Sequence, residues 1–300
     1  MTDTPEIDQR PPEPGHWLQN QLFRGVIASL SVLPYERRLA AMSWMSRRFI
    51  GPLAGYKARA LKNLAMVYPE KSEAERQAIA ERVLDSFGRS IMENYSRQEF
   101  RERIAKHEIH GPGLAAAQAA QEAGQPVIFS SGHYSNHEAT RTALDLAGFK
   151  VGGLYKPMSN PYFNLHYVDS ITEVSGPVFP LGKEGTKDFF HFLSNGGHGF
   201  LLHDVHYARG PKINFLGKPA KTALSAAELA LKFDGLLIPY FNTRQPDGVS
   251  FKIELCAPIP TSDPLTMTKE LVGLLEEKIA TDPGQWLWIH RRWKGVPGAA

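Results

Sequence analysis

Short apolar runs alternate with stretches of helical periodicity from residue 107 to the C-terminus. Runs of this kind, bounded by Gly, Pro, Asn or Ser, are typical of buried strands, and the stretches between them repeat apolar residues at helical spacing. The expected strands are 126–130, 150–155, 177–181, 199–203, 235–242 and 250–258, and the expected helices are 113–123, 136–146, 161–174, 183–193 and 222–233. This alternation predicts an α/β fold whose mostly parallel central sheet is covered by helices on both faces.

The last two expected strands are joined only by the short segment 243–249. This segment contains Pro246-Asp247-Gly248, which suits a hairpin turn. Because a hairpin joins antiparallel strands, the sheet is predicted to be mixed as well as mostly parallel.

The first third of the chain has a helical pattern, with helices expected over 36–49, 56–67 and 72–101. Ser72 and Glu75 have the spacing of a capping box at the start of the third helix. We expect residues 1–15 to be a disordered polar tail, 16–106 to be a helical segment packed on the core, and 107–300 to be the α/β core, all within one domain.

The net charge and the cysteine count restrict the classes of function that fit the chain but do not select one. The 34 Lys and Arg residues exceed the 31 Asp and Glu residues, giving a net charge of +3. Mild basicity suits an anionic membrane surface or a phosphorylated substrate, and without a nucleic-acid-binding motif we expect no nucleic-acid partner. The single cysteine, Cys256, allows no disulfide within the chain.

The apolar segment 22–35 is interrupted by Arg24 and Pro34, so it is too short to span a bilayer. The segment 17–30 contains tryptophan, leucine and isoleucine with an arginine among them. Two interpretations stay open for it: a helix that lies on a membrane surface, and a helix that packs on the main domain.

A histidine and a glutamate occur where a buried strand passes into a helix. His133 follows the expected strand 126–130, and Glu138 opens the following helix. The carboxyl ends of strands are where open α/β sheets bind their ligands. A histidine with a carboxylate has the make-up of a general base and its orienting partner, although such a pair also occurs on protein surfaces. The two side chains can meet only if His133 precedes the helix and Glu138 lies in its first turn.

Five stretches resemble, in the right order, the late acyltransferases of lipid A biosynthesis, which are the lauroyl and myristoyl transferases. They are residues 56–70, 133–138, 203–206, 215–222 and 286–294. The second matches the family motif of a histidine, four residues and an acidic residue. The resemblance implies the fold seen in glycerol-phosphate acyltransferases.

The resemblance also implies an acyltransferase that needs no cofactor or metal. His133 would remove a proton from a substrate hydroxyl, and Glu138 would hold the imidazole ring. The acyl donor would be a thioester of acyl carrier protein, and the acceptor a lipid A precursor or related phosphorylated glycolipid, with no acyl-enzyme. The enzyme would be peripheral, without a transmembrane helix, on the cytoplasmic face of the bacterial inner membrane.

Further site residues come from the same resemblance. The expected substrate-binding residues are Asn136, Lys156, Asp204, His206 and Arg291. Lys156 departs from the family, which usually has an arginine before the proline, and a lysine lacks the planar fork that grips phosphate. Residues 167–179 also lack the arginines that relatives carry there. The acceptor and the acyl chain length therefore stay open.

Two other functions fit the residues when the resemblance is set aside. His133, His137, His203 and His206 could form the metal site of a hydrolase, since two of them are four residues apart. The chain could also be a non-catalytic peripheral lipid-binding protein. The mixture of tryptophan and basic residues over 286–294 suits either a bilayer headgroup region or a core-packed segment with its basic side chains facing phosphate, and we expect the second.

Overall fold

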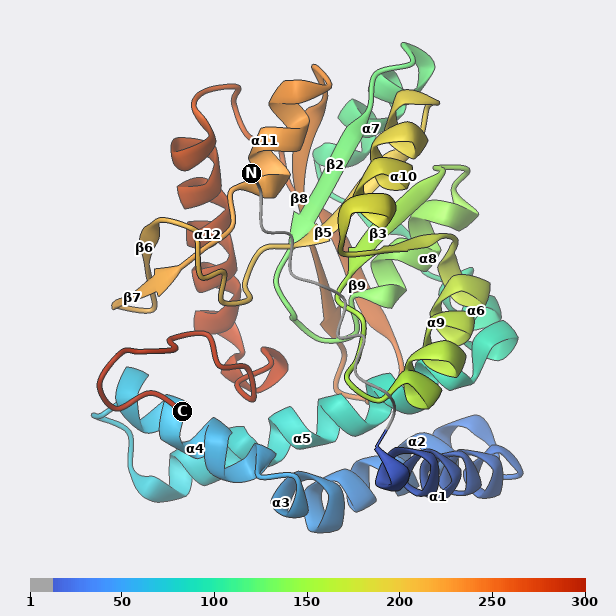
Figure 1. Ribbon diagram of the computed structural model, residues 1–300, viewed down its shortest axis with the longest axis vertical. Helices are drawn as coiled ribbons and strands as arrows, with labels where there is room; N and C mark the ends of the chain where they lie inside the picture. Colours follow the sequence, from blue (N-terminus) through green and yellow to red (C-terminus); the bar gives the residue numbers. More distant parts are fainter. Residues whose placement is uncertain (1–12) are drawn as a thin grey trace.

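The computed structural model describes residues 13–300 and has a seven-stranded sheet at its centre, in the order β1-β9-β8-β2-β5-β3-β4 (Figure 1). The strands of this sheet are β1 (Ile109–His110), β2 (Val127–Ser131), β3 (Val151–Tyr155), β4 (Val178–Pro180), β5 (His198–Leu202), β8 (Leu236–Arg244) and β9 (Phe251–Leu255). All neighbours pair in parallel except β8 and β9. The predicted α/β class with a mixed, mostly parallel sheet is confirmed.

Helices cover both faces of the sheet. They are α7 (Gly113–Glu122), α8 (Glu138–Leu146), α9 (Pro161–Ser175), α10 (Lys183–Ser194), α11 (Ser225–Lys232) and α12 (Pro264–Thr281). Alternate residues of β2 face opposite ways, so Ile128 packs with α10, α11 and α12, whereas Val127 and Phe129 pack with α7 and α8. The central strands are therefore buried on both sides, which is why they read as continuous apolar runs.

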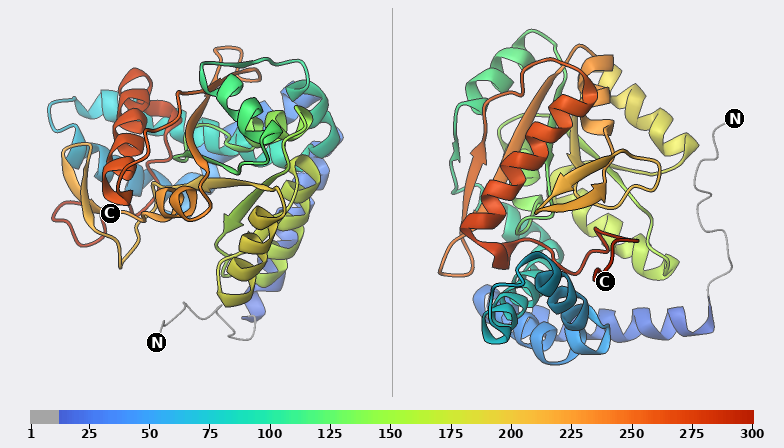
Figure 2. Two further views of the ribbon diagram at one scale, coloured as in Figure 1. Left: turned by 90° about the horizontal axis from the view of Figure 1, so that it is seen from above. Right: turned by 90° about the vertical axis from the view of Figure 1, so that its left-hand side faces the viewer.

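The N-terminal helices form a separate layer beside the sheet (Figures 1 and 2). They are α1 (Pro14–Ser31), α2 (Tyr35–Met45), the π-helical turn η1 (Ser46–Ile50), α3 (Gly51–Leu53), α4 (Tyr56–Val67) and α5 (Glu73–Tyr95). Helix α6 (Arg97–Ile104) follows them and packs beside α8 and α9. The predicted capping box of Ser72 and Glu75 is present at the start of α5. The helix expected over 72–101 is instead two helices, because Arg97 adopts a φ of 36°, which interrupts the α-helical backbone.

The C-terminal segment packs between this helical layer and the sheet. It follows α12 and the 3-10 turn η2 (Pro283–Gln285), and it packs near the small antiparallel hairpin of β6 (Lys212–Phe215) and β7 (Lys218–Lys221). Trp286, Trp288 and Trp293 are fully buried in one core cluster with residues of α4 and α5. The expectation that these tryptophans pack on the core is confirmed.

The expected tail, residues 1–15, falls almost entirely outside the described part of the chain, and α1 starts at Pro14. Within residues 13–300, no helix combines the length and apolar character that crossing a bilayer requires.

Candidate active site

The candidate site is formed where β2 and β5, neighbours in the sheet, both end. The register pairs Ser131 of β2 with Leu202 of β5, so the chain leaves the two strands at the same level. The loop after β2 carries His133, and the loop after β5 carries Asp204. Because the carboxyl ends of parallel strands meet at one edge, these two residues come into contact.

Asp204 holds His133 through two hydrogen bonds. The backbone nitrogen of His133 donates to Oδ2 at 2.7 Å, and the ring Nδ1 lies 2.7 Å from Oδ1. The indole Nε1 of Trp286 also donates to Oδ2, at 2.8 Å. The carboxylate is buried, so these bonds are shielded from water and fix the orientation of the imidazole.

The charge state of Asp204 determines which tautomer the histidine adopts. Burial alone would raise the pKa of this carboxyl, but the His133 imidazole and the hydrogen bonds it donates hold that pKa well below its usual range. An ionised carboxylate only accepts hydrogen bonds, so Nδ1 of His133 carries the proton. In the neutral ring, Nε2 then has a free lone pair. The side chain of His133 is 21% exposed, so its ring is partly open to solvent.

The structure corrects the expected contact between His133 and Glu138. The carboxylate of Glu138 accepts hydrogen bonds from Arg141 Nε at 2.8 Å and Ser175 Oγ at 2.7 Å, and it lies 3.4 Å from Nε2 of His137. As the first residue of α8, Glu138 points into the interior between α8 and α9. Burial opposes its ionisation, but Arg141 outweighs this and lowers the pKa of Glu138 to about 2. The orienting partner of His133 is Asp204.

Asn136 is a buried connector between the site loop and the helical layer. Its Nδ2 donates to Glu93 Oε2 at 2.9 Å and to Asn94 Oδ1 at 3.0 Å, both on α5. Its Oδ1 accepts from the backbone of Glu138, and its carbonyl oxygen accepts from Asn242 of β8. These contacts occupy its polar atoms within the protein, while its expected contact with substrate stays a prediction.

The loop that carries His133 is tightly folded and clamped by the C-terminal segment. Ser135 has a φ of 55°, in the left-handed region that non-glycine residues rarely adopt. Its backbone nitrogen donates to the carbonyl of Gln285 at 2.8 Å, and that of Leu287 donates to the carbonyl of His133 at 3.0 Å. At Gly132 a Cβ atom would lie 2.5 Å from a Leu275 methyl and 2.9 Å from Oδ2 of Asp204, so only glycine lets the carboxylate approach this closely.

Three further histidines surround the pair. The ring of His290 packs edge-to-face on that of His133 with centroids 4.3 Å apart, and the ring of His137 lies at 5.6 Å. Burial lowers the pKa of His290 to about 3 and that of His203 to about 4, so both stay neutral around pH 7. His203 contacts the hydroxyl of Ser130 at 3.1 Å.

These histidines do not form a metal site. His133, His137 and His203 each use a ring nitrogen on Asp204, Glu138 or Ser130. Within the described chain, no three or more His, Cys, Asp or Glu side chains are grouped so that they could hold a metal ion. The alternative cluster of His133, His137, His203 and His206 is therefore not assembled.

The expected cationic and imidazole ligands lie at the protein surface. Lys156 and Arg291 are exposed, and His206 is half-buried with an enclosed Nδ1 that has no partner among the described residues. Arg292 is different, because it is buried and donates to the backbone oxygens of Val205 and Lys221. In the C-terminal segment, Arg291 is therefore open to solvent, whereas Arg292 binds the backbone inside the protein.

Sequence reasoning missed Trp286 and His290 as members of the site. Both were part of a stretch assigned to the core, and nothing in their local pattern pointed to Asp204 or His133. The signal for Asp204 is stronger, since it directly follows a strand at the same sheet edge as His133. The resemblance implies that Asp204 positions the acceptor or a basic partner, but it does not identify His133 as that partner.

The chain matches the family model for bacterial lipid A biosynthesis acyltransferases over residues 6–295. It is 24% identical to a lipid A biosynthesis lauroyltransferase of Escherichia coli K12, covering 99% of this chain and 98% of that one. It is 22% identical to the lipid A biosynthesis myristoyltransferase of the same strain, covering 95% and 89% of the two chains. A lipid A biosynthesis acyltransferase of Haemophilus influenzae is also 22% identical, covering 94% and 90%.

The match extends over both the helical layer and the α/β core, and it includes His133, Asp204 and the C-terminal segment that binds them. The chain belongs to the bacterial lipid A biosynthesis acyltransferase family, and it is an acyltransferase.

Proposed function

We propose that this enzyme moves a fatty acyl chain from the thioester of acyl carrier protein to a hydroxyl of a lipid A precursor, with His133 as the general base. The observation that carries the proposal is the 2.7 Å contact between Nδ1 of His133 and the buried carboxylate of Asp204, which leaves Nε2 as an acceptor. The names of the relatives support lipid A as the acceptor class.

In the proposed reaction, Nε2 of His133 takes the proton from the acceptor hydroxyl as its oxygen attacks the thioester carbonyl. The tetrahedral intermediate collapses to the ester and a thiolate. The thiolate recovers the proton from the imidazolium, so His133 ends in its starting state. Asp204 stabilises the imidazolium and keeps the ring aimed at the acceptor. The step needs no acyl-enzyme, cofactor or metal.

Glu138 has a positioning role in this scheme. It neutralises Arg141 in the interior and contacts His137, whose ring lies beside that of His133. A lost carboxylate at this position would disturb the start of α8 and the loop before it. We therefore assign its effect on catalysis to the placement of the loop.

Exposed cations among the expected substrate-binding residues and in the C-terminal segment fit a phosphorylated acceptor. Lys156 and Arg291 are exposed, and Lys294 adds a further exposed charge two residues after the buried Arg292. A lipid acceptor resides in a membrane, so the enzyme would act peripherally, at the cytoplasmic face of the bacterial inner membrane where acyl carrier protein is available.

The test is acyl transfer from radiolabelled acyl-acyl carrier protein to a lipid A precursor in detergent. His133→Ala should lower kcat by about 10³-fold or more, since the base is removed. His191→Ala is the matched control, because His191 is exposed on α10. Transfer by folded His133→Ala within threefold of the wild type would exclude His133 as the base.

A further inference from the structure

Helix α1 carries a wide apolar arc, and the protein covers only part of it. Phe23 packs edge-to-face on Tyr95 and Phe163, and Ile27 and Leu30 pack against the core cluster that α2 and α6 share. The apolar arc of a helix is normally buried against another element. The uncovered side of α1 therefore has the composition of a surface that meets a second apolar partner.

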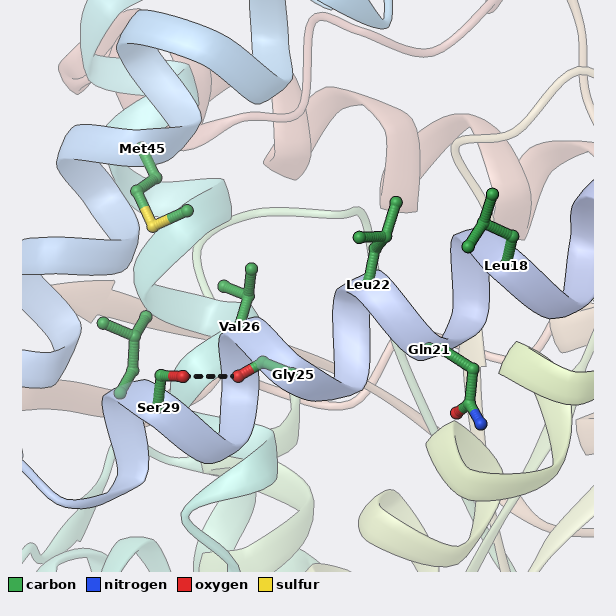
Figure 3. A pocket seen from close by; sticks show the side chains of 8 residues that line it. Leu18, Gln21, Leu22, Gly25, Val26, Ser29 and Met45 are labelled. Atoms are coloured by element: carbon green, nitrogen blue, oxygen red, sulfur yellow. Dashed lines mark hydrogen bonds between the residues drawn. The ribbon is translucent and has the colours of Figure 1, made fainter.

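The uncovered side forms one wall of an open groove. Leu18, Leu22 and Val26, spaced four residues apart, point to the same side of α1 and face Met45 of α2 (Figure 3). The groove has a volume of about 490 Å³ and an almost entirely apolar lining. Leu18 is 56% exposed and Leu22 is 64% exposed. None of the residues that line it belongs to the candidate active site.

A second apolar row continues from the groove along the next elements. Met45, Phe49 and Leu53 are again four residues apart and extend from α2 through η1 into α3. Leu53 is 87% exposed, and the exposed Trp44 packs edge-to-face on Phe49 with ring centroids 5.2 Å apart. We call the two rows, with Trp44, the apolar face; its exposed members are Leu18, Leu22, Trp44, Phe49 and Leu53.

The helices that carry the apolar face are strongly cationic. Residues 14–53, which make α1 to α3, contain five Arg residues, no Lys and one acidic residue, Glu36, for a net charge of +4, whereas the whole chain carries only +3. Arg24, Arg37 and Arg48 are exposed. None of these three arginines has a salt bridge within residues 13–300. Exposed leucines and aromatic rings with unneutralised arginines nearby are the composition of helices that lie in an anionic bilayer interface.

We propose that the apolar face docks on the surface of an anionic bilayer, with α1 lying in the interface plane and lipid acyl chains entering the groove beside Met45. The inference deepens the proposed function by giving the enzyme its contact with the membrane that holds the acceptor. The helical layer also abuts the site loop, because Glu93 and Asn94 of α5 bind Asn136. Docking through this layer would hold the site near the lipid surface (Figures 1 and 2).

The binding test uses vesicles of phosphatidylcholine alone and vesicles of equal parts phosphatidylcholine and phosphatidylglycerol. Wild-type protein should sediment with the anionic vesicles, and binding should weaken as salt is raised because the arginine contribution is screened. Leu22→Glu and Phe49→Glu should each lower the partition coefficient at least about tenfold, the loss expected when one buried apolar side chain is replaced by a charge. Arg24→Gln with Arg48→Gln should reduce the preference for anionic vesicles.

The matched control is Leu231→Glu, which places the same charge at an exposed leucine of α11 outside the apolar face. It should bind vesicles like the wild type. Equal vesicle binding by wild type, Leu22→Glu and Phe49→Glu would overturn the proposal, as would a loss with Leu231→Glu as large as with Leu22→Glu. Absence of wild-type binding to anionic vesicles would overturn it directly.

An activity readout separates this proposal from the proposed function. In Leu22→Glu and Phe49→Glu, the ratio of the rate on vesicle-embedded acceptor to the rate on detergent-dispersed acceptor should fall at least tenfold below the wild-type ratio. A wild-type protein that binds anionic vesicles but transfers no acyl group in either format would refute the proposed function and leave the docking surface standing. An unchanged ratio in both variants would refute the docking surface alone.

Discussion

The carboxylate of Asp204 accepts hydrogen bonds from both the backbone nitrogen and the ring Nδ1 of His133, each at 2.7 Å. The first bond fixes the start of the loop, and the second fixes the ring and its tautomer. The indole of Trp286 also donates a hydrogen bond to Oδ2, which restricts rotation of the carboxylate. One buried side chain thus sets both the position and the tautomer of the imidazole that we propose as the base.

Gly132→Ala should impair catalysis with a modest effect on folding. The added Cβ would lie 2.9 Å from Oδ2 of Asp204, so the carboxylate or the loop must shift. A displacement of this size should lower kcat by about 10–100-fold. Gly273→Ala is the control, because the added Cβ in α12 would meet no atom within 4 Å apart from the adjoining residues and backbone of its own helix, and the change should stabilise the helix by about 0.5–1 kcal/mol. A Gly132→Ala enzyme with wild-type kcat would contradict the tight packing at the carboxylate.

Arg141→Met should destabilise the fold strongly, because it leaves the buried Glu138 charge without its partner. The expected loss in the free energy of unfolding is about 3–5 kcal/mol, measured by urea denaturation. The double variant Glu138→Gln with Arg141→Met removes both charges and should recover much of that loss. Strictly additive losses in the double variant would show that the two charges are not coupled.

His290→Phe and His290→Ala test whether the ring against His133 acts through packing. Phenylalanine keeps a planar ring at the 4.3 Å contact, so kcat should stay within about fivefold of the wild type. Alanine frees the His133 ring on that side and should cost about tenfold to a hundredfold. A phenylalanine variant as impaired as the alanine variant would mean that the imidazole nitrogens of His290 contribute directly.

Stability should fall as the solution is acidified, partly because of His203. Burial lowers its pKa to about 4, whereas in the unfolded chain it titrates near the ordinary value. Below that ordinary value the unfolded state binds a proton that the folded state refuses, so acid favours unfolding. Between about pH 7 and pH 5 this should remove about 2 kcal/mol from the free energy of unfolding. His203→Phe should flatten the pH dependence by about that amount, and an unchanged slope would contradict the burial of a neutral imidazole.

The sequence was sufficient to predict the sheet strands β2, β3, β4, β5, β8 and β9 and the edge that carries the site, whereas the two-residue strand β1 is too short to leave an apolar run and was missed. Strands such as β2 are buried on both faces, so their sequences are continuous apolar runs that can be recognised directly. The hairpin of β6 and β7 was missed because Lys212, Lys218 and Lys221 give it little apolar character. Helix α12 was not anticipated either, and the break at Arg97 leaves no trace in the apolar periodicity of 72–101 because the apolar positions continue across it.

The hydrogen-bond partner of the His133 ring could not be predicted from the spacing of nearby residues in the sequence. Glu138 is five residues away in sequence, yet the start of α8 turns it inward toward Arg141. Asp204 is brought to His133 only by the pairing of β2 with β5, which is a property of strand order rather than of either segment. The contribution of Trp286 depends on a further long-range contact of the C-terminal segment with the site.

Asp204, and not Glu138, orients the imidazole that we propose as the general base. The most direct measurement compares single-turnover acyl transfer by Asp204→Asn and Glu138→Gln at equal concentrations of folded enzyme. Asp204→Asn keeps the side-chain shape but removes the charge and should slow transfer by about 10³–10⁴-fold, whereas Glu138→Gln should slow it by less than about tenfold. A fast Asp204→Asn enzyme beside a slow but fully folded Glu138→Gln enzyme would contradict the account.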